Sequence, residues 1–311
     1  MSGRITVLGS FMADLVCRAE RMPAWGETLR GNSFAAGPGG KGSNQAIAAA
    51  RQGACAHLIT RVGRDPFADM ARSIYQREGM DTTFVTEDPD NATGTASITV
   101  DDATGENAII IVPGACDHIT AADVDAASAT IAASALFLSQ LELPLDVCRR
   151  GMDLARRAGV PVLLNPAPGM ELPEGLLDHV DLITPNESEA SAITGCPVDS
   201  RADLETAASV LHRRGVRDVL ITLGANGVFL SSGEQQTMIP AVSAGPVVET
   251  TGAGDAFNGG LAAALAEGRP LQEAARFGNA VAGLSVARTG AALAMPNRDE
   301  VDALLAPSGS S

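Results

Sequence analysis

The chain has 311 residues, of which 45% are hydrophobic and 19% are charged, so it is long enough to bury a sizeable core in one large domain or two ordinary ones. Its 22 basic and 37 acidic residues give a formal net charge of −15, and this excess of acid argues against nucleic acid and anionic membranes as partners, because both need clustered Lys and Arg. We expect a soluble globular protein.

The five cysteines are widely spread and form no Cys-x-x-Cys pair that would indicate zinc or redox chemistry; they are Cys17, Cys55, Cys116, Cys148 and Cys196. We expect them to be reduced packing residues. The first residues lead straight into a strand-like run, and no stretch approaches the roughly 18 apolar residues of a membrane span. A cytoplasmic location is therefore expected.

Short apolar runs alternate along the chain with helix-length segments rich in Ala, Leu and Arg. The predicted strands are Ile5–Gly9, His57–Val62, Ala135–Ser139, Pro161–Asn165, Asp181–Thr184 and Asp218–Leu223, and two of the predicted helices are Ser43–Gln52 and Asp255–Glu267. Repeated strand–helix units predict an α/β fold with a mostly parallel sheet covered by helices on both faces.

Two segments interrupt this alternation. Asp14–Phe34 contains a proline and a glycine between alternating stretches, and Gly94–Pro113 has the pattern of a hairpin with strands Thr95–Asp101 and Asn107–Val112. Neither segment can bury two faces by itself, so we infer a small β-sheet lid formed by about 12–36 and 94–113 within a single domain, 1–311. Its exposed face is expected to form a homodimer contact.

The stretch Gly37–Gly42 satisfies G-x-G-x-x-G, but it contains a proline and lacks the downstream acid of a dinucleotide site. It also fails as a Walker P-loop, because Lys41 is followed by Gly42. Its glycines either let the backbone approach a small polar ligand, with Lys41 and Asn44 as donors, or form a structural turn.

Gly252, Ala253 and Gly254 come just before the predicted helix that begins at Asp255. The first backbone N–H groups of a helix are unpaired and carry partial positive charge, so these three residues are candidates for binding a phosphate. Asp255 is a candidate base beside that phosphate. The alternative is that Asp255 is an ordinary acid in the first turn of a helix, where acids are favoured.

Asn186 and Glu189 follow another predicted strand and are three residues apart, on one face of any helix that begins there. They either cap that helix or act at a Mg²⁺ site, since Mg²⁺ is held by water, phosphate and one or two carboxylates and no His/Cys cluster offers a transition-metal site. Thr222–Gly227 also follows a strand, where ligand crevices of parallel sheets lie.

Five ordered motifs together resemble the ribokinase-like, or PfkB, family of carbohydrate kinases, and within it the pentose kinases. The motifs are Gly39–Asn44, Leu164–Pro168, Thr184–Glu189, Ile221–Gly224 and Thr251–Phe257, and the resemblance runs from about Ile5 to about Leu305. It implies a three-layer sandwich with a β-sheet lid, and ATP-dependent phosphorylation of the primary (5-) hydroxyl of a pentose such as D-ribose, with Mg²⁺ and K⁺ as cofactors.

The resemblance also assigns roles to residues. Asp255 matches the catalytic base, and Gly252, Ala253 and Gly254 match the anion hole that stabilises the transferring phosphoryl group. The implied sugar-binding positions are Met12, Asp14, Gly40, Lys41, Gly42, Asn44, Glu142 and Asp255. The implied nucleotide positions are Asn186, Thr222, Gly224, Gly227, Gly254 and Asn279, with Glu189 on Mg²⁺ through water. The implied monovalent-cation positions are Glu249, Thr251, Ser285, Arg288, Gly290 and Ala294.

Three residues depart from the family pattern. Met12 replaces an asparagine that faces the sugar, and because a thioether cannot donate a hydrogen bond, 2-deoxyribose competes with ribose as the expected substrate. Glu249 stands where the cation loop usually has Asp, and Ala294 where it commonly has Ser, so K⁺ activation is expected to be altered. A nucleoside or hexose kinase, and a non-catalytic sugar-binding protein with the same fold, are also compatible with these motifs.

Overall fold

The main body is built on one nine-stranded sheet, as seen in a computed structural model that describes residues 3–306. The strand order is β13-β12-β11-β10-β9-β8-β1-β4-β5. Their bounds are β1 Arg4–Leu8, β4 Cys55–Val62, β5 Val85–Glu87, β8 Leu136–Ser139, β9 Val162–Leu164, β10 Leu182–Ile183, β11 Asp218–Thr222, β12 Val228–Ser232 and β13 Gln235–Ile239. The outermost residues of the expected 1–311 domain lie outside the described residues.

The prediction of a mostly parallel sheet is confirmed. All pairs from β5 to β11 are parallel, and each of the six predicted strands is present with its ends shifted by at most two residues. The hairpin β12–β13, which adds two antiparallel strands beyond β11, was not predicted from the sequence. Its exposed outer strand, rich in Gln and Thr, lacks the apolar run that marks the central strands.

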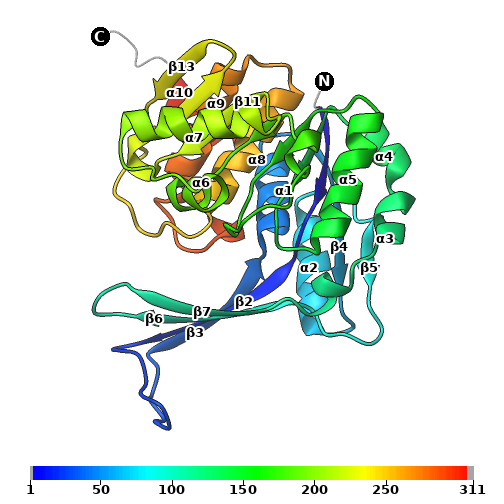
Figure 1. Cartoon of the computed structure of the whole chain (residues 1–311). Helices are drawn as coiled ribbons and strands as arrows, with labels where there is room; N and C mark the ends of the chain where they lie inside the picture. Colours follow the sequence, from blue (N-terminus) through cyan, green and yellow to red (C-terminus); the bar gives the residue numbers. More distant parts are fainter. Residues whose placement is uncertain (1–2, 307–311) are drawn as a thin grey trace.

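Helices cover both faces of this sheet, so the predicted three-layer sandwich is confirmed (Figure 1). One core contains side chains from α1 (Lys41–Arg51), α2 (Pro66–Arg77), α8 (Ala253–Ala266), α9 (Leu271–Ser285) and α10 (Arg298–Leu305). The other contains side chains from α3 (Ala121–Ala126), α4 (Ser128–Ala132), α5 (Leu145–Arg157), α6 (Glu187–Thr194) and α7 (Arg201–Arg213). Alternation along the strands sends Ile5 and Val7 of β1 into the first core and Leu8 into the second.

The lid is a separate four-stranded sheet of order β3-β2-β6-β7 that projects from the body (Figure 1). Its strands are β2 Met12–Ala19, β3 Ser33–Gly39, β6 Thr95–Asp101 and β7 Asn107–Val112. The predicted β-sheet lid is thus confirmed, with β3 running three residues past the expected boundary at 36. The two insertions meet where β2 pairs in parallel with β6.

The lid joins the body at a tight crossing of two glycine-containing segments. Gly40 has φ +85°, in the region that favours glycine, and a Cβ atom there would lie 2.7 Å from the Met12 backbone nitrogen. A Cβ on Gly42 would lie 2.5 Å from Cα of Gly9. These two glycines therefore serve the close packing of backbone on backbone, which is the structural alternative raised by the sequence.

Two helices begin earlier than predicted. Helix α1 starts at Lys41 and not at Ser43, and α8 starts at Ala253 with Gly252 as its N-cap and not at Asp255. Glycine has weak helix propensity, and here the tertiary packing of both segments overrides it. Asp255 consequently lies within the first turn of α8.

The expectation that all the cysteines are packing residues is wrong for two of them. All five are free thiols; Cys116 and Cys148 are buried, but Cys17 and Cys55 are exposed. Among residues 3–306, no helix has the length and apolar composition needed to cross a membrane.

Candidate active site

Polar side chains gather where the parallel strands end. Ser10 follows β1, Glu142 follows β8, Asn165 follows β9 and Thr184 follows β10. The carboxyl ends of parallel strands share one edge of the sheet, the place where ligands bind in open α/β sheets. The starts of α1 and α8 meet these side chains through hydrogen bonds, so one site is assembled from six segments of the chain.

Asp255 is buried, with 7% of its surface exposed, and two amides hold its carboxyl group. Asn44 Nδ2 donates to Oδ2 at 2.9 Å, and Gln45 Nε2 donates to Oδ1 at 2.8 Å. Burial raises the pKa of Asp255, while the charge of Lys41 and the two amide donors oppose that rise. The result is a fixed carboxyl group with an unused lone-pair direction on each oxygen.

A chain of buried amides supports Asp255 from behind. Gln45 Nε2 also donates to Asn165 Oδ1 at 2.9 Å, and Asn165 Nδ2 donates to the Thr184 carbonyl at 3.0 Å. Thr184 Oγ1 donates to Asn258 Oδ1 at 2.6 Å, and Asn258 Nδ2 returns to the Gly254 carbonyl at 2.9 Å. The network therefore starts and ends on the first turn of α8.

Gln45, Asn165, Thr184 and Asn258 were not among the site residues predicted from the sequence. A signal was available: Gln45 and Asn258 are large polar residues within helices buried on nearly every side, where an unpaired amide is costly. Such positions call for partners, although the sequence cannot say which ones.

The start of α8 offers free backbone donors, with one exception. The amide of Ala253 donates to the Thr250 carbonyl at 3.1 Å, so the expectation that it faces an anion is not met in this conformation. Within residues 3–306, the amides of Gly252, Gly254 and Asp255 have no hydrogen-bond acceptor. The turn through Thr250, closed by Gly252 at φ +76°, uses the Ala253 donor and leaves these other amides available.

Lys41 is the cation at the centre of the site. Burial lowers its pKa, but the charges of Asp255, Glu142, Glu189 and Asp14 together outweigh burial and raise it. Lys41 therefore stays protonated at neutral pH. Because one ammonium group senses all four carboxyl groups, the residues predicted from separate motifs share one electrostatic site.

Asp14 is the most perturbed carboxyl group on the lid side. Burial first, and then the charges of Asp255 and Glu142, raise its pKa to about 7. It lies on β2, opposite Gly37 of β3. A carboxyl group with this pKa changes its charge near neutral pH, which is common for groups that contact a ligand.

Glu142 fixes the crossing at the base of the lid. Its Oε2 accepts from the backbone amide of Lys41 at 2.9 Å and from the hydroxyl of Ser10, and its Oε1 lies 3.9 Å from Lys41 Nζ. This carboxylate therefore caps the start of α1 and places the Lys41 side chain.

Asn186 and Glu189 form a reciprocal capping box at the start of α6. Asn186 Oδ1 accepts from the Glu189 amide at 2.8 Å, and Glu189 Oε2 accepts from the Asn186 amide at 2.8 Å. The capping alternative is thus correct as a description of their structural role. Burial raises the pKa of Glu189, which also senses Lys41 and Asp255.

Two of the residues predicted for the nucleotide, Gly227 and Asn279, contact a different segment. Gly227 has φ +88°, and a Cβ atom there would clash with the Ile239 carbonyl; Asn279 Nδ2 donates to the Pro240 carbonyl at 2.9 Å. Both residues therefore support the segment after β13. Thr222 and Gly224 lie at the end of β11, where Thr222 pairs with Asn186.

The predicted monovalent-cation residues come from the segment just before α8 and from the end of α9 and the segment after it. Glu249 Oε2 accepts from the Gly290 amide at 3.0 Å, and the buried Ser285 hydroxyl donates to the Ala282 carbonyl at 2.8 Å. Arg288 pairs with Glu300, and Ala294 is buried in a short 3-10 helix, Ala292–Ala294. Nothing in these contacts places Thr251 on a cation.

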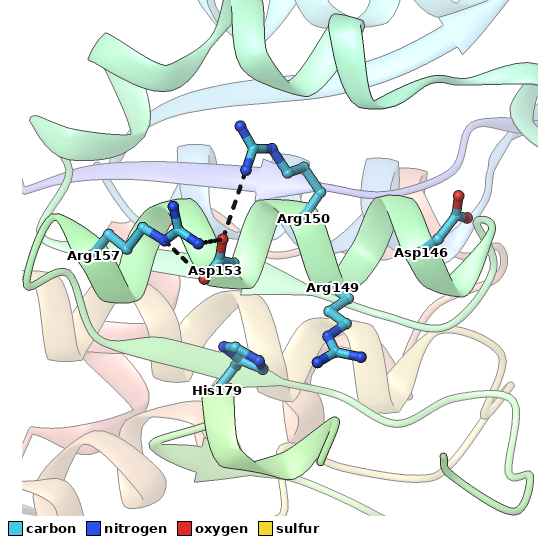
Figure 2. A pocket seen from close by; sticks show the side chains of 6 residues that line it. All are labelled: Asp146, Arg149, Arg150, Asp153, Arg157 and His179. Atoms are coloured by element: carbon cyan, nitrogen blue, oxygen red, sulfur yellow. Dashed lines mark hydrogen bonds and ion pairs between the residues drawn. The ribbon is translucent and has the colours of Figure 1, made fainter. Parts of the chain in front are cut away.

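A surface hollow of about 290 Å³ lies elsewhere, over α5 (Figure 2). It is lined by Asp146, Arg149, Arg150, Asp153, Arg157 and His179. Arg150 and Arg157 both pair with Asp153, so this hollow is a solvated ion-pair surface. None of its lining residues belongs to the site around Asp255.

A parallel α/β sandwich with a β-sheet lid, a buried carboxyl group and free amides at a helix start together define a kinase that acts on a small alcohol. The pfkB family carbohydrate kinase model matches residues 2–298. The chain belongs to this family and is a sugar kinase.

Individual relatives are similar to this chain over nearly their whole length. A ribokinase of Haemophilus influenzae is 41% identical over 300 residues, covering 96% of this chain and 97% of the relative. A deoxyribokinase of Salmonella typhi is 34% identical, covering 97% and 98%. The structure of Arabidopsis thaliana ribokinase complexed with ribose and ATP superposes with a TM-score of 0.90 at 32% identity, covering 99% of this chain and 100% of that one.

Proposed function

We propose that this chain transfers the γ-phosphoryl group of ATP to the primary 5-hydroxyl of D-ribose, with the described fold acting as one catalytic unit. The observation that carries the proposal is Asp255, a buried carboxylate held by two amides beside the free amides of Gly254 and of Asp255 itself. The similarity to ribokinases along the whole chain supports ribose as the sugar.

Asp255 takes the proton of the sugar hydroxyl as that oxygen attacks phosphorus. Its pKa is raised by burial, so it is a stronger base than a solvated aspartate, and the donors on both oxygens keep it ionised and fixed in direction. The negative charge on the transferring group moves toward the free amides at the start of α8 and the ammonium of Lys41.

The sugar is held by residues at the base of the lid. Asn44 Oδ1 is a buried acceptor with no partner in residues 3–306, a costly arrangement that a sugar hydroxyl would relieve by donating to it. Asp14, Lys41 and the backbone around Gly40 lie at the same crossing of lid and body. Closure of the lid over the sugar excludes water, so that phosphate goes to the sugar and not to solvent.

Glu189 and Glu249 are the carboxylates available for binding Mg²⁺ and K⁺, respectively. Glu189 offers one buried carboxylate near Lys41, which suits a Mg²⁺ ion held otherwise by water and phosphate; Mg²⁺ would neutralise phosphate charge. Glu249 already binds the Gly290 amide, so a K⁺ ion would share that carboxylate with the backbone. Turnover at fixed ionic strength with K⁺ or with tetramethylammonium tests the K⁺ role.

The lid is proposed to pair with the lid of a second copy. Exposed apolar side chains gather on it: Trp25, Phe34, Ile109, Ile110, Ile111 and Val112. Apolar exposure of this kind on a small sheet is typical of an interaction surface. Ile110→Glu should convert a dimer into a monomer in light scattering, and a wild-type chain that is monomeric at all concentrations would reject this part of the proposal.

Asp255→Asn tests the reaction itself. The variant keeps the size of the side chain but cannot accept the proton, so turnover with ribose should fall about 10²–10⁴-fold. Its amide nitrogen would face the donor of Asn44 or Gln45, so thermal melting is measured alongside to verify that the variant is folded. ADP release with ribose, 2-deoxyribose, fructose and adenosine distinguishes a pentose kinase from a hexose or nucleoside kinase. Retention of more than about a tenth of turnover in the variant would contradict the assigned base.

2-Deoxyribose is the second candidate substrate, and Met12 is the observation that favours it. Met12 begins β2 at the base of the lid and is 2% exposed, so its thioether presents a buried apolar surface. A hydroxyl placed against it would lose its hydrogen bonds to water without replacement.

A further inference from the structure

A thiol, an imidazole and a carboxyl group lie together at the amino end of β4, whereas the candidate active site lies at the carboxyl ends of the parallel strands. Cys55 and His57 are the first and third residues of β4, so both point to the same face of the sheet. Asp81 follows α2 and forms a parallel bridge with His57. A strand as long as β4, of eight residues, spans roughly 25 Å, so this cluster is remote from Asp255.

The distances connect the three groups in series. Cys55 Sγ lies 3.7 Å from His57 Nε2, and His57 Nδ1 lies 3.1 Å from Asp81 Oδ2. Asp81 is itself held, because its Oδ1 accepts from the Thr83 amide at 2.8 Å. Hydrogen bonds from Thr83, and to a smaller extent the nearby His57, lower the pKa of Asp81. Asp81 is therefore an ionised acceptor at neutral pH.

His57 is suited to accept a proton from the thiol. Only 6% of the residue is exposed, and burial, opposed by Asp81 and aided by Arg4, lowers its pKa. The imidazole is therefore neutral at pH 7. The carboxylate beside Nδ1 favours the tautomer with the proton on that nitrogen, which leaves the lone pair of Nε2 toward Cys55.

We propose that Cys55 is a nucleophilic thiol, with His57 as its base and Asp81 as the residue that orients His57, and that it is modified by anionic low-molecular-weight disulfides. A nucleophile, a base within reach and a third group behind the base is the general arrangement of activated nucleophiles. Neither the kinase reaction nor the packing of the core uses this arrangement, and Cys55 is exposed to reagents.

The step is a thiol–disulfide exchange. The proton of Cys55 passes to His57 Nε2 as the sulfur attacks one sulfur of the disulfide R–S–S–R. A new S–S bond joins Cys55 to R, and the old S–S bond breaks. The departing thiolate takes the proton from His57, so Cys55 is oxidised and the reagent is reduced to one thiol.

Arg4 favours a negatively charged reagent, and the Asp81 carboxylate, which contacts His57 at Nδ1 and not at the nitrogen nearest the thiol, opposes it. Arg4 is exposed on β1 and its Cα is the register partner of Cys55, and its charge is felt at His57. An anionic disulfide such as oxidised glutathione should therefore react faster than the neutral 2-hydroxyethyl disulfide, relative to their rates with a small free thiol.

The test measures site-resolved mixed-disulfide formation on the reduced full-length protein by peptide mass spectrometry at pH 7.4. With oxidised glutathione, Cys55 in the folded protein should react about tenfold faster than Cys55 in the urea-unfolded chain. This rate increase is smaller than the about 10²–10⁴-fold that general-base catalysis can supply. Equal or slower reaction in the folded protein would overturn the proposal.

Two variants separate activation from mere exposure. His57→Gln should remove the enhancement at Cys55, and Asp81→Asn, at a carboxylate that is 40% exposed, should reduce it with little effect on folding. Cys17, also exposed, reports the reagent in the same samples and should keep its rate in every variant. An unchanged Cys55 rate in Asp81→Asn and in folded His57→Gln would show that the cluster does not activate the thiol.

Discussion

Gln45 Nε2 lies between two acceptors, 2.8 Å from Asp255 Oδ1 and 2.9 Å from Asn165 Oδ1. The opposite end of the same amide, Gln45 Oε1, accepts from Gln140 Nε2 at 2.7 Å. This last contact prevents the amide from turning over, because a reversed Gln45 would place its nitrogen against the Gln140 donor. The direction of the Asp255 carboxyl group is thus set by residues on three other segments.

Gln45→Met should lower turnover at neutral pH by about tenfold or more, since a hydrogen bond to a charged group contributes about 1.5–3 kcal/mol. Gln45 lowers the pKa of Asp255, so its loss raises that pKa and moves the acid limb of the turnover profile to higher pH. The base is then ionised in a narrower range. A pH profile of kcat measures the shift.

Gln52→Met is the matched control for this variant. Gln52 is also a fully buried glutamine at the end of the same helix, and its Nε2 donates to the Pro296 carbonyl at 2.7 Å. Both variants should lose stability, but only Gln45→Met should move the pH profile. Equal profiles for the two variants would show that Gln45 has only a structural role.

Much of this fold could be predicted because its signals are local. The strands β1, β4, β8, β9, β10 and β11 are short apolar runs, and the lid hairpin has alternating strands around a polar turn. The sequence signal that placed Asp255 beside a helix start was equally local. The hydrogen-bond partners of Asp255 were not, since Asn44 and Gln45 are 211 and 210 residues away in the chain and meet it only in the tertiary fold.

The roles of the glycines also could not be distinguished from the sequence alone. From sequence alone, Gly40 and Gly42 could equally serve a ligand or a turn, and only the structure reveals that Gly42 packs on the backbone of Gly9. Gly254, in contrast, has no atom within 4 Å of the place its Cβ would occupy. Two helical glycines of similar sequence context therefore predict opposite consequences of substitution.

Gly42→Ala should destabilise the protein, although alanine is favoured over glycine inside a helix by about 1 kcal/mol. The new Cβ would lie 2.5 Å from Gly9 Cα, and backbone cannot move away cheaply, so a net loss of about 1–3 kcal/mol is expected. Urea unfolding measures it. A gain in the free energy of unfolding would mean that lid and body separate easily at this crossing.

Gly254→Ala should keep the free energy of unfolding unchanged or slightly raised, because the methyl group meets no protein atom. Turnover should nevertheless fall, since the methyl group occupies space beside the free amides where a phosphate would bind. Kinetics with varied ATP, alongside thermal melting, test both parts. Normal kcat and KM would place the phosphate away from the start of α8.

Asp14→Asn should change the pH dependence of stability in the sugar-free protein. The pKa of Asp14 is raised to about 7 by burial and by Asp255 and Glu142, against an ordinary value of 3.8. Between these two pH values the unfolded chain has released a proton that the folded protein retains, so wild-type stability falls as pH rises through this window. Asparagine cannot ionise and removes this slope.

Thermal melts of both proteins from pH 4 to pH 8 measure the difference, which should grow with pH in favour of Asp14→Asn and level off above about pH 7. The same variant should bind ribose more weakly, because a carboxylate is a better acceptor for hydroxyl groups than an amide. Parallel curves for the two proteins would contradict the raised pKa.

Met12→Asn should raise the ratio of kcat/KM for ribose to that for 2-deoxyribose. Met12 is 2% exposed, so an amide placed there needs a partner inside the site, which a 2-hydroxyl would supply and 2-deoxyribose would not. A hydrogen bond of about 1 kcal/mol corresponds to roughly a fivefold change in the ratio. Met12→Leu, which keeps the volume and adds no donor, is the control. If both variants change the ratio equally, packing and not hydrogen bonding at residue 12 determines which pentose is preferred.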